Sequence, residues 1–288
     1  MDNKEKRRLK QKIVFGAVRL SSAVVVASLF AIIFFIFAKG WSAINWEFLT
    51  QAPRNAMTEG GIFPAILGTF YLTIGAILVA MPLGIATAIY LTEYSNEGKI
   101  VKIIRNGINN LAGVPSIVFG LFGLAFFVIF LNFRASILSG SLTLGFLILP
   151  VIIGATEEAL KTVPLSYREA SLALGGTKWQ TIYKVVLPCA LPGILTGAII
   201  GIGRAAGETA PIIFTAATFY TTRLPKSIFD EVMALPNHIY VMATAGTHIE
   251  ETRQIQYGTA LVLIALVMVL NAGAIIARYR FRKKLKGE

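Results

Sequence analysis

Long apolar stretches with almost no charged residues constrain this chain more than any other feature. The run from Ile13 to Ala38 holds a single charge, Arg19, and further apolar runs recur along the 288 residues. Hydrophobic residues make up 55% of the chain and charged residues only 15%, which is far from the composition of a soluble globular domain. This much apolar surface excludes intrinsic disorder, and runs of this length suit a lipid environment. The sequence therefore predicts an integral membrane protein.

Six segments are long and apolar enough to cross a bilayer, since a helical span needs about 20 mainly apolar residues. We expect spans at 13–38, 63–91, 111–131, 137–159, 190–217 and 258–277. The first is longer than the apolar core of a signal peptide, contains a charge and is followed by no A-x-A cleavage site. The predicted fold class is all-α: a polytopic membrane protein with six transmembrane helices, of which the first stays uncleaved.

The distribution of Lys and Arg predicts the orientation of these spans. Most of the 27 Lys and Arg residues precede the first span, follow the last one, or lie in the connecting segments 93–110 and 161–188. Positively charged loops stay in the cytoplasm, so both ends of the chain, 1–12 and 279–288, are expected there. The net charge of +12 then reflects topology and contact with anionic membrane lipids rather than binding to nucleic acid.

Arg204 and Glu208 stand out because both fall inside a predicted span. In a continuous helix over 190–217, Arg204 lies near the middle and Glu208 follows one turn later on the same face. An ionised group at the bilayer centre costs at least about 2.5 kcal/mol, so neither side chain can face lipid. A structural ion pair that fixes helix packing is one interpretation. A place in a substrate path is the other, and we favour it because ionisable groups within membranes are mostly functional.

The chemistry of this pair suits a tetrahedral oxyanion. A guanidinium offers a planar fork of hydrogen-bond donors to such an anion. The Glu208 carboxylate would repel sulfate, but it could accept a hydrogen bond from a protonated phosphate. We therefore expect Arg204 and Glu208 to line a substrate path with some preference for phosphate.

Other polar residues indicate no catalytic or metal-binding site. The pair Glu157 and Glu158 is expected at a solvated helix end rather than in a catalytic dyad. His238 and His248 are too far apart for a helical metal motif and are expected at the surface of an outer loop. With a single cysteine, Cys189, the chain has no Cys/His pattern typical of a metal site.

The connecting segment 161–188 predicts two short helices joined by a tight turn. Residues 164–174 read as an amphipathic helix, and Gly175 and Gly176 then let the chain turn sharply. A second short segment follows, and Pro188 is expected to end it where the next span begins. A plain pair of interfacial helices would account for this pattern without any further function.

The same segment resembles the EAA loop of ABC-importer permeases. The resemblance rests on Glu169-Ala170-Ser171, then Gly175, then Val185-x-Leu187-Pro188, at the spacing of that motif. Ser171 and Val185 replace the usual second Ala and the usual Ile. The resemblance implies that Glu169, Ala170 and Gly175 contact a separate ATPase subunit. The chain has no G-x-x-x-x-G-K-[ST] phosphate loop, so ATP is expected to be bound by that partner, and the chain itself is not expected to be an enzyme or to hold a cofactor.

Three further blocks, 60–69, 111–123 and 203–211, are similar to the permeases of phosphate-specific importers, of the PstA type rather than the PstC type. The resemblance implies a bacterial or archaeal inner-membrane subunit that forms half of a phosphate path. Its implied partners are a PstC-type permease, an ATPase dimer and an extracytoplasmic phosphate-binding protein, which would dock on outer loops including 219–257. The chain then divides into a basic N-terminus (1–12), a first transmembrane helix (13–38), a core permease domain (39–278) and a basic tail (279–288).

Two other interpretations remain open at this stage. A permease of the same family could carry another oxyanion, such as sulfate or molybdate. An autonomous channel or secondary anion transporter would account for Arg204 and Glu208 but leaves the 161–188 motif unexplained. The sequence contains no nucleophile–base pair that would indicate a membrane-embedded enzyme.

Overall fold

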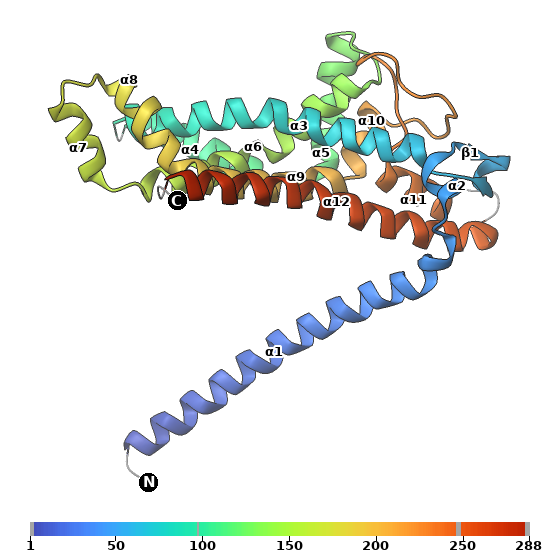
Figure 1. Ribbon diagram of the computed structural model, residues 1–288, viewed down its shortest axis with the longest axis horizontal. Coiled ribbons are helices and arrows are strands. Elements are labelled where there is room, and N and C mark those ends of the chain that lie inside the picture. The colour runs from blue at the N-terminus through green and yellow to red at the C-terminus, as the bar shows by residue number, and fades with distance from the viewer. Residues whose placement is uncertain (1–2, 97, 246–248, 286–288) are drawn as a thin grey trace.

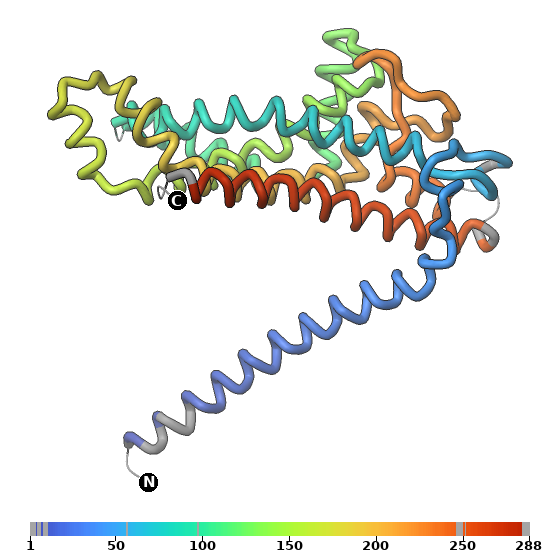
Figure 2. Tube along the Cα trace, in the orientation of Figure 1, coloured from blue at the N-terminus to red at the C-terminus, as the bar shows by residue number. Residues whose placement is uncertain are grey.

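The computed structural model describes residues 3–96, 98–245 and 249–285, and nearly all of its regular structure is helical (Figures 1 and 2). Two strands, β1 (Pro53–Arg54) and β2 (Glu59–Gly60), form a small antiparallel hairpin near one end of the molecule. The α-helices are α1 (Asn3–Gly40), α2 (Trp46–Thr50), α3 (Phe63–Ile89), α4 (Lys99–Ala112), α5 (Ser116–Gly123), α6 (Ile137–Lys161), α7 (Leu165–Ala173), α8 (Lys178–Thr181), α9 (Leu187–Gly207), α10 (Ala210–Thr215), α11 (Leu235–Thr244) and α12 (Ile249–Leu285). Short 3-10 helices are η1 (Trp41–Ala43) and η2 (Asn55–Met57), and π-helical segments are η3 (Tyr90–Tyr94), η4 (Leu124–Phe130) and η5 (Ile182–Val186).

The long helices form a bundle from which α1 diverges. Helices α3, α6, α9 and α12 run alongside one another, with α6 packed against both α3 and α9 and α12 packed against α9 (Figure 1). Helix α1 meets α12 near Gly40, where a Cβ would lie 2.6 Å from the backbone of Tyr257. The glycine therefore permits this close crossing. From there α1 extends away from the bundle (Figure 1).

The predicted six-span, all-α fold is confirmed, with a different third span. Five helical stretches are long and apolar enough to cross a membrane: 11–43, 63–94, 137–161, 178–207 and 252–283. The sixth is a bent pair, 99–112 followed by 116–130, with an angle of 104° between its halves. The predicted span over 111–131 therefore begins too late, and it covers mainly the second half of this bent pair. Pro115 breaks the helix because its ring fixes its own φ and pushes Val114 out of the helical region.

The predicted fifth span, 190–217, is wrong at both ends. It begins at Lys178, and Pro188 lies within it rather than ending the segment before it. The π-helical turn η5, which ends at Val186, widens the helix just before Pro188, which supplies no backbone N–H. The helix then ends at Gly207, since Glu208 has extended backbone angles (φ −75°, ψ 135°).

Small residues allow α9 to lie close to α6. A Cβ at Gly193 would lie 2.6 Å from the Cβ of Ala159, and one at Gly197 would lie 2.5 Å from that of Ala155. Close backbone approach through small residues is the usual way in which helices pack within membranes. Farther along, the central core is formed by apolar side chains from α3, α5, α6, α9 and α10, among them Leu72, Phe119, Leu147, Ala205 and Ile212.

The segment between α10 and α12 folds back onto the end of the bundle that carries β1 and β2 (Figure 1). Helix α11 packs against α12 and α3, and the backbone N–H of Leu235 donates to Thr69 Oγ1 at 2.8 Å. His238 of α11 is 1% exposed, so the prediction of a surface histidine is wrong. Burial lowers the pKa of His238 from 6.5 to about 4. The other predicted surface histidine, His248, lies outside the described residues.

Candidate functional site

Arg204 and Glu208 meet at the broken end of α9. Arg204 lies in the last turn of the helix and Glu208 is its C-cap, with Arg204 Nε 3.5 Å from Glu208 Oε1. The prediction of one continuous helix through both residues is wrong, but the two side chains still pair. Their exposed fractions are 34% and 18%. The pair is therefore open to a surface of the bundle rather than sealed in its core.

The register between α9 and α6 gives the depth of Arg204. Gly193 lies opposite Ala159, Gly197 opposite Ala155, and Gly201 beside Ile152. The two helices thus run antiparallel, and Arg204 lies one turn beyond Gly201. This turn is level with the middle of α6, which runs from Ile137 to Lys161. The helix therefore ends near the middle of the neighbouring span, and irregular backbone at that depth is tolerated only where it is buried in protein or lines a water-filled cavity.

Asn271 of α12 is a polar residue near this site that sequence reasoning missed. A Cβ at Gly203 would lie 3.9 Å from Asn271 Nδ2, so the amide packs against α9 one residue before Arg204. Its Oδ1 is buried and has no hydrogen-bond partner among the described residues. A single Asn in the predicted span 258–277 was the available signal.

The residues predicted to contact an ATPase lie together on α7 and the turn after it. Helix α7 covers Leu165–Ala173, close to the predicted 164–174, and Gly175 has a φ of +81°, which favours glycine. Glu169, Ala170 and Gly175 are all exposed. Leu174 is 90% exposed, which leaves an apolar side chain available to another protein.

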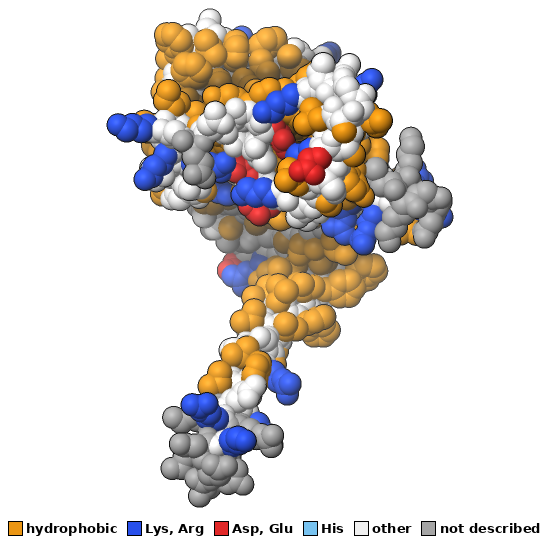
Figure 3. Space-filling model, turned by 90° about the vertical axis from the view of Figure 1, so that its left-hand side faces the viewer, with side chains coloured by type: hydrophobic (Ala, Val, Ile, Leu, Met, Phe, Trp, Pro, Cys, Tyr) orange, Lys and Arg blue, Asp and Glu red, His pale blue; other side chains and the backbone are white. Residues whose placement is uncertain are grey.

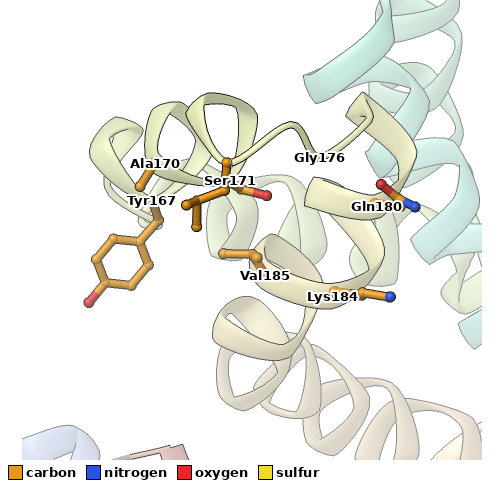
Figure 4. A pocket seen from close by; sticks show the side chains of 8 residues that line it. Tyr167, Ala170, Ser171, Gly176, Gln180, Lys184 and Val185 are labelled. Carbon is orange, nitrogen blue, oxygen red and sulfur yellow. The ribbon is translucent and has the colours of Figure 1, made fainter.

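A cavity of about 480 Å³ lies between α7 and the helix that begins with α8 (Figure 4). Ala170 lines it, whereas Glu169 and Gly175 do not. Thr177 caps α8 in a capping box with Gln180, and the hydroxyls of Ser171 and Thr181 lie 2.9 Å apart. These contacts fix the two walls of the cavity. Its lining residues are Tyr167, Ala170, Ser171, Leu174, Gly176, Gln180, Lys184 and Val185.

Arg168 is the residue of this segment that sequence reasoning passed over. Its guanidinium donates to Glu93 Oε1 at 2.7 Å and to the backbone carbonyls of Leu160 and Val163. Lys178 adds a second link to the same place, since its Nζ lies 4.9 Å from the ring centroid of Tyr94. Both walls of the cavity are thereby attached to η3, the continuation of α3.

Glu157 and Glu158, which were both expected at a solvated helix end, differ in burial and in their ion-pair partners. Glu158 is exposed and its Oε1 lies 2.7 Å from Lys161 Nζ. Glu157 is 7% exposed and pairs with Arg105 of α4, so the prediction is wrong for this residue. Burial of Glu157 is tolerated because the guanidinium both neutralises it and hydrogen bonds to it. The same Arg105 donates to the carbonyl of Leu91 at 3.2 Å.

The family described as “Binding-protein-dependent transport system inner membrane component” matches residues 80–287. The chain belongs to this family. The match includes α7, the cavity beside it and the Arg204–Glu208 pair. Membership indicates a multi-pass inner-membrane protein that is a component of a transport system.

Relatives of this transport component are similar over nearly their whole length. “Probable ABC transporter permease protein YqgI” of Bacillus subtilis is 34% identical over 93% of this chain and 95% of its own. “Phosphate transport system permease protein PstA 1” of Mycobacterium tuberculosis is 36% identical over 95% of this chain and 90% of its own. A chain from a bacterial ABC transporter that imports alginate has a similar fold, with a TM-score of 0.64 at 15% identity, over 96% of this chain and 99% of that chain.

Proposed function

We propose that this chain is the PstA-type permease subunit of an ATP-driven phosphate importer and forms half of its translocation path. The observation that carries the proposal is the similarity to phosphate transport permeases over more than nine-tenths of the chain, at 36% identity. This similarity extends across both the α7 segment and the Arg204–Glu208 pair. The fold alone does not favour phosphate, because alginate importers share it.

The proposed orientation places both ends of the chain in the cytoplasm, together with α7 and α8. Figure 3 looks onto this end of the molecule and has Lys and Arg side chains spread around it, with fewer acidic ones. Positive charge of this kind favours the cytoplasmic side of a bilayer. The β1–β2 hairpin and α11 then lie outside, where a phosphate-binding protein would dock.

In this proposal the driving force comes from a separate ATPase dimer, which binds the ATP. The exposed side chains of α7 and the cavity beside Ala170 would receive the ATPase. Closure of the ATPase dimer would move α7, and the links from Arg168 and Lys178 to η3 would pass that movement to α3. The other half of the path would be supplied by a PstC-type permease.

Arg204 and Glu208 would meet the anion near the middle of the path. The Arg204 side chain is partly exposed, and its positive charge is partly neutralised by the Glu208 carboxylate 3.5 Å away. It would therefore attract an anion without binding it tightly. Weak binding is needed, because an ion path must release as well as admit its ion. The carboxylate would accept a hydrogen bond from protonated phosphate, which sulfate cannot donate at neutral pH.

Reconstitution into liposomes tests this proposal against its alternatives. The chain alone, and the chain with a PstC-type permease, an ATPase and a phosphate-loaded binding protein, would be assayed with labelled phosphate, sulfate and molybdate. The proposal predicts that liposomes take up phosphate but neither sulfate nor molybdate. Uptake should require all four components and ATP. Uptake by the chain alone would favour an autonomous transporter, and ATP-driven uptake of sulfate or molybdate but not phosphate would assign another oxyanion.

A further inference from the structure

Helix α4 has three faces of different character. Val101, Ile104 and Ile108 pack against the apolar cluster formed by the ends of α3 and α6 and the first half of α9. A second apolar stripe is exposed, with Ile100 at 71% and Ile103 at 69%. The third face is polar and also exposed, and it carries Lys99, Lys102, Asn106 and Asn109 at helical spacing. We call this set the polar stripe.

The contacts of α4 place it inside the membrane-spanning part of the bundle. Arg105 pairs with Glu157 near the end of α6, and one turn before the end of α4, Asn109 lines a cavity shared with Pro150. Helix α4 therefore runs antiparallel to α6, from its α7 end to the level of Pro150. The expectation that 93–110 is a cytoplasmic connection is wrong for α4.

The polar stripe ends close to the depth of Arg204. Pro150 lies less than one helical turn from Ile152, and Ile152 is beside Gly201, one turn before Arg204. Polar side chains at this depth cannot face hydrocarbon, since unsatisfied polar groups there cost several kcal/mol each. Lys102, Asn106 and Asn109 have no side-chain hydrogen bond or ion pair with another described residue. They must therefore face water or another protein.

Two cavities lie along α4 beside the polar stripe, and three of its residues, Lys99, Lys102 and Asn109, line one or the other. One, of about 370 Å³, lies between α4 and α6 and is lined by Arg105, Asn109, Gly154, Glu158 and Lys161, among others. The other, of about 510 Å³, lies at the start of α4 and is lined by Gly98, Lys99, Val101, Lys102 and Arg105. Arg105 lines both, so the two cavities adjoin along the helix.

The charges along these cavities favour an anion over a cation. Arg105 is neutralised by Glu157 and Lys161 by the adjacent Glu158. Lys99 and Lys102 have no carboxylate within ion-pair distance among the described residues. The cavity at the start of α4 thus carries a net positive charge from Lys99 and Lys102, while Asn106 and Asn109 offer neutral amide donors farther along the helix.

We propose that the polar stripe of α4 lines the inner half of the oxyanion path, between Arg204 and the cytoplasmic mouth. The proposal rests on the proposed function for the direction of transport and for phosphate as the ion. The stripe replaces the ion's water with amide and ammonium donors as it leaves the membrane. The neighbouring apolar stripe, which includes Ile103, faces lipid.

Cysteine accessibility tests the position of the stripe without reference to any substrate. In a Cys189→Ser background, Asn106→Cys and Asn109→Cys are compared with Ile103→Cys and Leu111→Cys, which lie on the apolar stripe of the same helix. The complete importer, in inside-out membrane vesicles, is treated with an anionic, membrane-impermeant thiosulfonate reagent. Because thiosulfonates react with the thiolate and not with a thiol kept in lipid, we expect modification of the two Asn positions to be about tenfold faster or more.

The opposite pattern would overturn the proposal. Equal rates at all four positions would mean that water does not distinguish the polar stripe from the apolar one. Protection of Asn106→Cys and Asn109→Cys in every nucleotide state would mean that the stripe is covered by the second permease or another protein. Antibody quantification of each variant in the vesicles excludes loss of the protein as the cause.

Uptake measurements separate this proposal from the proposed function. In the natural background, Lys102→Gln is expected to lower phosphate uptake by about threefold, because it removes local positive potential, and Lys102→Glu to lower it further. If the Asn106→Cys and Asn109→Cys variants are modified quickly but Lys102 substitutions change sulfate uptake instead of phosphate uptake, the stripe lines an oxyanion path and phosphate is the wrong substrate. Unchanged uptake of every tested oxyanion by Lys102→Glu would reject the path.

Discussion

Arg168 of α7 and Glu93 of η3 lie 75 positions apart in the chain, and Arg168 Nη2 is 2.7 Å from Glu93 Oε1. The two side chains are only 16% and 9% exposed. The same guanidinium donates to the carbonyls of Leu160 and Val163 at the end of α6. One side chain thus attaches α7 both to η3, the continuation of α3, and to the end of α6.

We expect loss of the Arg168–Glu93 contact to uncouple ATP hydrolysis from transport without unfolding the protein. Glu93→Gln leaves the mostly buried Arg168 charge without its partner, and breaking a buried pair costs about 3 kcal/mol or more. Arg168→Lys keeps the charge but loses the two-pronged contact. Both variants should transport less phosphate for each ATP hydrolysed, measured in liposomes that contain the complete importer.

Glu158→Gln is the matched control for these variants. Glu158 also pairs with a basic residue, Lys161, but its side chain is 73% exposed, and exposed pairs contribute less than about 1 kcal/mol. Its ratio of transport to hydrolysis should equal that of the natural chain. A ratio unchanged in Glu93→Gln as well would show that α7 does not act through η3.

The buried His238 predicts a stability that falls in mild acid. Its pKa is about 4 in the folded protein and 6.5 in the unfolded chain. Below pH 6.5 the unfolded chain therefore binds a proton at this residue that the folded protein does not bind. Stability is therefore complete above pH 6.5 and decreases until about pH 4, by a total on the order of 3 kcal/mol. Thermal unfolding in detergent, scanned across this range, measures the effect. His238→Phe should flatten the curve, and an equally steep curve in that variant would assign the acid sensitivity to other groups.

The close packing of α9 on α6 predicts strong sensitivity at Gly197. A leucine there would collide with Ala155, whose Cβ lies 2.5 Å from the position of a new Cβ, and overpacking costs about 1–3 kcal/mol. Gly197→Leu should lower the melting temperature and shift Arg204, with loss of transport. Gly273→Leu on α12 is the control, because nothing lies within 4 Å of a Cβ at Gly273. Equal melting temperatures for the two variants would contradict the close packing of α9 on α6.

Glu208 is expected to contribute to selectivity rather than to rate. Glu208→Gln removes the negative charge beside Arg204 but keeps a hydrogen-bonding group, so sulfate should be repelled less. Competition of unlabelled sulfate against labelled phosphate uptake measures the change. Sulfate that competes no better than with the natural chain would leave Glu208 with only a packing role.

Helix boundaries could be predicted best from the sequence where a proline or a glycine marks them. Pro164 and Gly175 bracket α7, and both act through their own backbone geometry, so the helix boundaries followed directly. Prediction was least accurate where charge and burial coincide. Helix α4 went unrecognised as part of a span because Lys99, Lys102 and Arg105 interrupt its apolar pattern.

The errors at individual residues share a cause, which is contact with distant parts of the chain. Glu157 is buried because Arg105, 52 positions away, neutralises it, and His238 is buried because α11 folds onto α12 and α3. Neither partner can be identified from local sequence. The end of α9 at Gly207 was also missed, although Gly207 and Pro211 flank Glu208 and are typical of a helix break.

The most direct test of the account is phosphate uptake at low external phosphate in cells that lack this chain. The cells would be given back the intact chain or Arg204→Gln, with sulfate as a parallel tracer. We predict that the intact chain restores uptake of phosphate but not of sulfate, and that Arg204→Gln restores little of it. Full restoration by Arg204→Gln would remove that residue from the path, and no effect of the intact chain on phosphate uptake would contradict the proposed function itself.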